Sequence, residues 1–257
     1  MQSQSSWKSQ LDDYLATSRV LSTAEIVHFG KDQLSIGERS VKEYLGFLLR
    51  EELIRKPYNG LYFVNNDKEP VTLREVAPYI NSDAVVSLDT VFKDNGGEST
   101  RSTDVRGNPN VFMFVPIKNP KSPPKVGVVK TLEGNIHVHS INDSIFSSIG
   151  KKNEDNDKYR SHKPEMAAAL AIFSDNSNRS SYSFNDENHT ITFPPMDIGK
   201  FVKIAEILKI NEDSITKNLS HFQQKDQQPI IDAILKQNLN QKHPVRQRPT
   251  PSEKFKP

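Results

Sequence analysis

The sequence contains no cysteine among its 257 residues. This absence excludes disulfide bonds, thiolate zinc sites and cysteine nucleophiles, and it suits a reducing compartment. Long apolar runs are also lacking: no stretch approaches the roughly 20 apolar residues that a helix needs to span a bilayer. The first residues have no apolar core of signal-peptide length. We therefore expect a soluble, cytoplasmic protein without a membrane partner.

A strong net charge is missing as well. The formal net charge is +2, although charged residues make up 26% of the chain and apolar residues 35%. No overall electrostatic field therefore points to nucleic acid or membrane, and any nucleic-acid binding must depend on local patches. The chain length predicts one large or two modest domains.

Residues 5–66 have the pattern of a winged helix-turn-helix domain. Apolar residues at helical spacing predict three short helices, near residues 7–15, after Ser22 and after Gly37. Ser22 to Glu25 has the S-x-x-E form of a capping box, which marks the start of the second helix. Two strands are expected at residues 53–56 and 60–64, around a turn that contains Asn59-Gly60, a pair that tolerates positive φ and favours a hairpin.

A winged helix-turn-helix predicts a DNA interface. Its third helix enters the major groove and presents its N-terminal side chains to base edges, which predicts base contacts by Arg39, Ser40 and Lys42. The wing residues expected to face the phosphate backbone are Arg55, Lys56, Tyr58 and Asn59. Residues 1–60 contain eight basic and eight acidic side chains. Because the domain is neutral, a protein-interaction module that binds a protein partner without DNA contact is the alternative hypothesis.

Three segments carry a family resemblance. Residues 60–64 (GLYFV) match a wing motif, residues 79–91 are similar to the segment that follows it, and residues 163–170 (KPEMAAAL) are similar to a helix that opens with proline and glutamate. In this order the segments resemble the AbiEi family, the antitoxins of bacterial type IV toxin–antitoxin systems. The resemblance implies a winged helix that binds inverted repeats in its own promoter and represses its operon. It also implies a C-terminal part that supports dimerisation or antitoxicity against a nucleotidyltransferase-like toxin.

Residues 70–240 predict a mixed α+β domain for oligomerisation or partner binding, so the fold class of the whole chain is α+β. Strands are expected at residues 111–115, 125–130 and 135–139, a hairpin at 182–193, and helices with apolar faces at 164–173, 198–208, 215–222 and 230–235. Such faces usually form core, but at a chain end they also suit a homodimer. The charged run 151–163 predicts a mobile loop, and residues 241–257 predict a disordered basic tail.

The segment from residue 98 to residue 130 is the most basic ordered part, with six basic and two acidic side chains. A second phosphate-facing surface there would use Arg101, Arg106, Lys118, Lys121 and Lys125, with Lys130 at its end. A basic segment of this kind more commonly forms a solvent-exposed sheet edge that carries lysines. His137 and His139 share one face of a strand. No third ligand stands at a metal-site spacing, so we expect two polar residues on a partly exposed strand and no metal.

Motifs of catalysis are absent from the sequence. It has no glycine-rich phosphate loop and no G-x-S-x-G nucleophile elbow. Asp89 and Asp94 follow an apolar run, but without the further carboxylate and glycine–serine step of a nucleotidyltransferase. We expect a non-enzymatic regulator without a cofactor. An unrecognised enzyme acting on nucleic acid is a third hypothesis, because catalytic groups often converge only in space.

Overall fold

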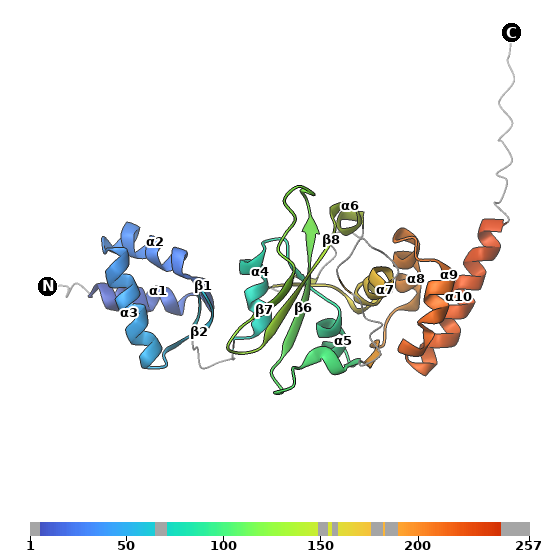
Figure 1. The fold of residues 1–257 in the computed structure, drawn as a ribbon, viewed down its shortest axis with the longest axis horizontal. Helices are drawn as coiled ribbons and strands as arrows, with labels where there is room; N and C mark the ends of the chain where they lie inside the picture. Colours follow the sequence, from blue (N-terminus) through green and yellow to red (C-terminus); the bar gives the residue numbers. More distant parts are fainter. Residues whose placement is uncertain are drawn as a thin grey trace, which may run out of the picture.

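A computed structural model describes residues 6–64, 71–148, 154–155, 159–175, 182 and 190–242. The protein is a mixed α+β fold with several sheets, as expected from the sequence. Its parts follow one another along the long axis, with the N-terminal helices at one end, the largest sheet in the middle and α8 to α10 at the other end (Figure 1). Within the described ranges, no helix has both the length and the apolar character required to cross a membrane.

Residues 6–64 form the N-terminal unit. Its elements are α1 (Trp7–Ala16), β1 (Val20–Ser22), α2 (Thr23–Leu34), α3 (Glu38–Arg50), β2 (Ile54–Tyr58) and β3 (Leu61–Val64). The three helices and the hairpin lie where the sequence predicts them. The capping box is confirmed, because the Glu25 amide donates to Ser22 Oγ at 3.2 Å and the Ser22 amide donates to Glu25 Oε2 at 2.7 Å. The antiparallel strands have the order β1-β3-β2.

Strand β3 is buried on both faces. Tyr62 and Val64 belong to the core formed with α1, α2 and α3, whereas Leu61 and Phe63 point to the opposite side. Alternate residues of a strand face opposite sides of the sheet, so a second layer must cover the side with Leu61 and Phe63. That layer is the following part of the chain, which contributes Val71, among others, to the same apolar cluster.

Polar contacts join the N-terminal unit to the C-terminal part (residues 71–242). The Arg19 guanidinium donates to both carboxylate oxygens of Glu75, at 3.0 and 3.2 Å. The Tyr79 hydroxyl donates to the Val20 carbonyl at 2.7 Å, and the Leu132 amide donates to the Pro57 carbonyl at 3.1 Å. The predicted domains 5–66 and 70–240 therefore share an apolar cluster and a set of hydrogen bonds.

We expect Arg19→Ala to lower the free energy of unfolding by about 1–3 kcal/mol, since it removes two donors from a charged acceptor that is 5% exposed. Urea unfolding monitored by circular dichroism measures this change. Arg50→Ala, at an exposed position at the end of α3, is the matched control and should stay within about 0.5 kcal/mol of the parent. Equal free energies of unfolding for the two variants would show that the Arg19–Glu75 pair does not stabilise the contact between the N-terminal unit and the C-terminal part.

The C-terminal part begins with short elements that lead into long strands. These are η1 (Leu73–Val76), α4 (Ala77–Ile80), β4 (Val85–Val86), α5 (Asp89–Asp94), β5 (Glu98–Ser99), η2 (Thr100–Ser102), β6 (Asn110–Ile117), β7 (Gly127–Lys130) and β8 (Asn135–Asn142). They are followed by α6 (Asp143–Ser148), β9 (Glu154–Asp155), β10 (Arg160–Ser161), α7 (Pro164–Asp175), β11 (Ile191–Thr192), α8 (Ile198–Ile207), α9 (Glu212–Lys217), η3 (Leu219–His221) and α10 (Gln224–Lys242).

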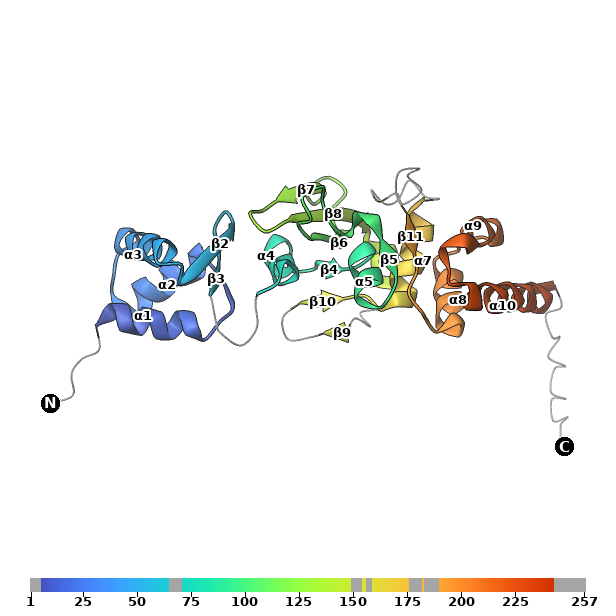
Figure 2. The same cartoon turned by 90° about the horizontal axis from the view of Figure 1, so that it is seen from below.

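The main sheet has six strands in the order β7-β8-β6-β4-β10-β9, and β6 pairs with β8 in parallel over eight residues. Figure 2 shows this sheet from another side, with β6, β7 and β8 next to one another. Val111, Met113 and Val115 of β6 face the cluster shared with the N-terminal unit. Phe112 and Phe114 face the opposite cluster. Both faces of the sheet are therefore covered, which explains why β6 is apolar from Val111 to Ile117.

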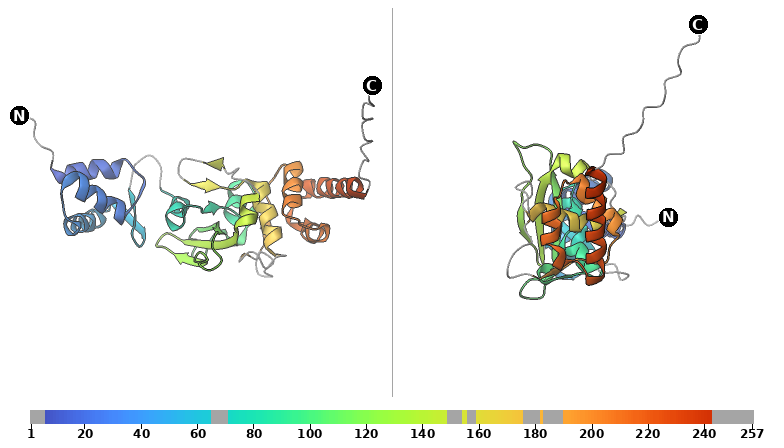
Figure 3. Two further views of the ribbon diagram at one scale, coloured as in Figure 1. Left: turned by 90° about the horizontal axis from the view of Figure 1, so that it is seen from above. Right: turned by 90° about the vertical axis from the view of Figure 1, so that its right-hand side faces the viewer.

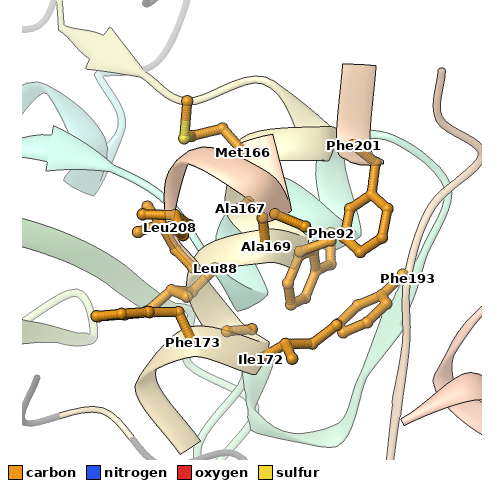
Figure 4. Packing of buried hydrophobic residues seen from close by; sticks show 14 of the residues in the cluster. Leu88, Phe92, Met166, Ala167, Ala169, Ile172, Phe173, Phe193, Phe201 and Leu208 are labelled. Atoms are coloured by element: carbon orange, nitrogen blue, oxygen red, sulfur yellow. The ribbon is translucent and has the colours of Figure 1, made fainter. Parts of the chain in front are cut away.

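The second cluster lies under α7 (Figure 4). Ala167, Ala168 and Ala169 are fully buried, and their small side chains let neighbouring elements approach α7 closely. Figure 4 shows Phe201 of α8 and Phe193 from the segment before it beside Phe92 of α5. Helices α8, α9 and α10 then form the end of the molecule (Figure 3). The predicted apolar helix faces thus serve mainly as core.

The structure corrects two expectations at the chain's charged segments. Within the run 151–163, predicted to be a mobile loop, β9 and β10 pair with each other and β10 extends the main sheet in parallel with β4. Strands of two residues are too short to show a periodicity in the sequence, so the sequence could not indicate them.

Helix α10 ends at Lys242, two residues into the predicted tail. Residues 243–257 and most of the hairpin expected at 182–193 lie outside the described residues, while Ile191 and Thr192 pair with β5.

Candidate nucleic-acid interface

Helix α3 provides the predicted base-reading residues. Its apolar side buries Val41, Tyr44, Leu45 and Leu48, so the side chains between them are turned outward. Arg39, Ser40 and Lys42 are all exposed. Gly37 is the N-cap and makes no side-chain capping bond, which leaves the first amides of α3 without a side-chain acceptor from the cap.

The two cations of this surface are paired along the helix. Arg39 Nε donates to Glu43 Oε1 at 2.8 Å, and Lys42 Nζ is in contact with Glu38 Oε1. The hydrogen bond between Glu38 and Lys42 lowers the pKa of the carboxyl group and raises the pKa of the amine. Both pairs are open to solvent, with the Arg39 side chain 92% exposed and that of Glu43 64%. The surface therefore presents two cations and two anions without a net charge.

The hairpin divides its four predicted residues between two environments. Tyr58 and Asn59 are exposed at the turn, where Gly60 adopts φ +81. Arg55 is 41% exposed and its Nη1 donates to Glu133 Oε1 at 2.7 Å. Burial raises the pKa of the Glu133 carboxyl group, an effect that Arg55 opposes. Lys56 Nζ lies 5.8 Å from the centre of the Tyr62 ring. Arg55 is thus held at the contact with the C-terminal part.

The residues of the predicted second basic surface do not lie together. The Arg101 side chain is only 14% exposed: its Nε is 3.8 Å from Asp89 Oδ1, and its guanidinium lies over the rings of Phe112 and Tyr182. Lys118 Nζ donates to Asp83 Oδ2 at 2.5 Å. Arg106, Lys121 and Lys125 are exposed, but β6 separates Arg106 from the two lysines by eight strand residues. Arg101 is therefore largely buried, which corrects its prediction as part of an exposed basic surface.

His137 and His139 face the cluster under α7. The His137 ring stacks on Phe112 with centroids 4.4 Å apart, and the His139 ring meets Tyr182 edge-on at 5.1 Å. Burial and the nearby Arg101 lower the pKa of His137. In the described part of the chain, no group of three or more His, Asp or Glu side chains is placed to hold a metal ion. The two histidines act here as packed rings.

Sequence reasoning missed Asp89 as a buried anchor. Its carboxylate is inaccessible to solvent and accepts hydrogen bonds from Ser99 Oγ at 2.5 Å and from the Tyr182 hydroxyl at 2.7 Å. A signal was present, since Asp89 follows Leu88 and comes just before the apolar residues Val91 and Phe92. The sequence does not show which hydroxyl groups donate to Asp89, so this signal alone could not identify a buried carboxylate. The cluster fixes the start of α5 to the sheet, and the Phe112 amide donates to Thr90 Oγ1 at 2.8 Å beside it.

Among the residues predicted to contact DNA, Arg39, Ser40 and Lys42 thus share one exposed surface, the N-terminal half of α3, while Tyr58 and Asn59 are exposed at the separate turn between β2 and β3. No known family model and no curated protein matches this chain.

Proposed function

We propose that this chain is a cytoplasmic, non-enzymatic transcriptional regulator that binds duplex DNA through a winged helix-turn-helix formed by its N-terminal unit. The observation that supports this best is the order α1-β1-α2-α3-β2-β3, with the apolar side of α3 buried and Arg39, Ser40 and Lys42 exposed. A helix presented in this way matches the width of the major groove, about 12 Å, and its N-terminal side chains reach the base edges.

The turn between β2 and β3 has a separate role in this proposal. Tyr58 and Asn59 would contact the phosphate backbone beside the groove and fix the orientation of α3 without reading sequence. Arg55, predicted as a wing contact, would contribute less, because Glu133 engages it. Lys56 stays a predicted phosphate contact. The amides at the start of α3 would add a further donor set for a phosphate.

The family resemblance extends the proposal to the biological setting. An AbiEi-like antitoxin would bind inverted repeats upstream of its own gene and repress its operon, and a homodimer would present two copies of α3 to the two repeats. The C-terminal part would provide the dimer contact or bind a nucleotidyltransferase-like toxin. A neighbouring reading frame for such a toxin, and co-purification of the two proteins, test this extension separately from DNA binding.

Arg39→Ala should lower affinity for the upstream duplex by about 1–3 kcal/mol if Arg39 makes a bidentate contact to guanine, with a smaller loss on a scrambled duplex. Fluorescence anisotropy at 150 mM salt, roughly the physiological ionic strength, measures both affinities. Arg50→Ala removes the same charge at the other end of α3 and should bind like the parent. A parent protein that does not prefer the upstream duplex would end the proposal.

A protein-interaction module is the second candidate function, and a groove between α1 and α3 favours it. The groove is lined by Trp7, Lys8, Ser40, Glu43, Tyr44 and Phe47. The Phe47 side chain is 43% exposed, and its ring stacks on Tyr44 with centroids 5.8 Å apart. This function requires a protein complex that survives high salt and is unaffected by Arg39→Ala.

A further inference from the structure

The exposed half of α3 carries four charged side chains in a fixed pattern. Lys42 pairs with Glu38 and Arg39 pairs with Glu43, each four residues apart, and these four residues together line one shallow hollow on the surface. Four residues of helix advance about 6 Å along the axis. All four side chains are more than half exposed, so solvent or a ligand reaches them from the same side.

We infer that Glu38 and Glu43 are specificity-determining residues of the DNA interface, and that the half-site read by α3 contains neighbouring G·C base pairs. This inference rests on the proposed function. It goes beyond that function because it assigns a role to the acidic partners rather than to the cations, and because it names the base pairs that the surface recognises.

The carboxylates oppose binding to an arbitrary sequence. Non-specific affinity comes from cations that neutralise phosphates and release counterions. In this surface each cation brings a carboxylate with it, so Glu38 and Glu43 approach the negative duplex together with Arg39 and Lys42. Attraction and repulsion nearly cancel, and a duplex that offers only phosphates gains little from contact with α3.

A G·C pair offers what both members of the Arg39–Glu43 pair require. The guanidinium donates two hydrogen bonds to the O6 and N7 acceptors of guanine, and a carboxylate accepts from the N4 amino group of cytosine. Adenine also has a donor, N6, but its N7 acceptor lies beside that donor and repels a carboxylate. Arg39 and Glu43 are about 6 Å apart along the helix, less than two base-pair steps. When they give up their ion pair, Arg39 can contact the guanine of one G·C pair and Glu43 the cytosine of its neighbour. Both side chains therefore find partners only where two G·C pairs are adjacent.

The test uses the full chain with Glu43→Gln and Glu38→Gln. Glu51→Gln is the matched control, since it removes the same charge at the exposed C-terminal end of α3. That end is well beyond one Debye length, about 8 Å at physiological salt, from the first turn. Binding to the upstream duplex and to a scrambled duplex of equal composition is measured by anisotropy between 50 and 200 mM salt, concentrations that span about the range where phosphate contacts dominate. Selection from a randomised duplex library identifies the preferred base pairs.

For Glu43→Gln we expect affinity for the scrambled duplex to rise roughly five-fold, as for one unit charge at contact distance from a phosphate in water. The logarithmic salt slope should steepen by about 0.9. The parent should select duplexes with neighbouring G·C pairs. Glu43→Gln should weaken selection at the pair whose cytosine the carboxylate contacts, while the guanine contacted by Arg39 stays selected. Thermal unfolding should be unchanged, because both carboxylates are exposed.

Two results would overturn the inference while leaving the proposed function intact: behaviour of Glu43→Gln and Glu38→Gln identical to that of Glu51→Gln, or selection of A·T pairs by a parent protein that discriminates between duplexes. A parent protein without any duplex preference overturns the proposed function itself, and the inference falls with it. Measurement of the parent alone separates these cases.

Discussion

Asp89→Ala should lower the free energy of unfolding by about 3–5 kcal/mol, the cost of removing one partner from a buried ion pair. The substitution takes the carboxylate away from the Arg101 guanidinium and removes the acceptor of the Ser99 and Tyr182 hydroxyls. Asp89 and Tyr182 are inaccessible to solvent, and Arg101 is 14% exposed. Leu88, just before Asp89, has φ 57, a conformation that L-residues avoid and that packed neighbours must hold in place. Loss of the Asp89 contacts therefore also releases this strained turn.

Urea unfolding at neutral pH measures the effect of Asp89→Ala. Asp13→Ala removes a carboxylate from an exposed position of α1 and should change stability by no more than about 0.5 kcal/mol. Combining Asp89→Ala with Arg101→Met should recover part of the loss, because the core then contains neither charge. Strictly additive losses in the double variant would argue that Arg101 and Asp89 do not act as a pair.

The stability of the fold should decrease as the pH falls below about 6.5, because of His162. This side chain lies in the core with its Nδ1 2.8 Å from Ser87 Oγ, and burial lowers its pKa to about 3. The folded protein therefore keeps the ring neutral while the unfolded chain binds a proton at the ordinary pKa of about 6.5. The contribution is complete above that pH and decreases by about 1.4 kcal/mol per pH unit as the pH falls toward 3.

Urea unfolding at pH values from 7.5 to 4.5, roughly the window set by these pKa values, should show a loss of about 2–3 kcal/mol. His162→Gln removes the titrating group and should flatten most of this dependence. His137 acts in the same direction, because burial lowers its pKa as well, so His137→Gln should remove a smaller part. Stability that stays constant between pH 6.5 and 4.5 would contradict a neutral, buried His162.

Contact between the two parts of the chain limits which residues of the N-terminal unit are available to a partner. One face of the N-terminal sheet is bonded to the C-terminal part through the Arg19–Glu75 ion pair and the hydrogen bond from Tyr79 to the Val20 carbonyl. Arg55, in the same sheet, pairs with Glu133. Helices α1, α2 and α3 pack on the opposite face of this sheet, away from the C-terminal part (Figure 2). In the proposed regulator, α3 would face DNA on the side turned away from the C-terminal part. The turn at Tyr58 and Asn59 lies beside that part, because the Leu132 amide donates to the Pro57 carbonyl.

Local sequence determined the elements of the N-terminal unit. The capping box of Ser22 and Glu25 involves residues three apart, and the Asn59-Gly60 turn depends on the backbone freedom of those two residues. The helical faces of α3 and the strands β6 and β8 follow from apolar spacing in the same way. The exposed position of Arg39 also follows, since it lies opposite the apolar face of its own helix.

Tertiary structure alone decided which charged residues stay on the surface. Arg101 and Lys118 stand in the same basic segment, yet one lies in the core beside Asp89 and the other pairs with Asp83 in solvent. Arg55 is predicted as a wing contact, but its partner Glu133 comes from a turn between two distant strands. The partners lie 12, 35 and 78 residues away from these cations along the chain. Spacing along a chain specifies the period of a helix or strand, whereas a partner so far away is set only by how the sheets and helices pack.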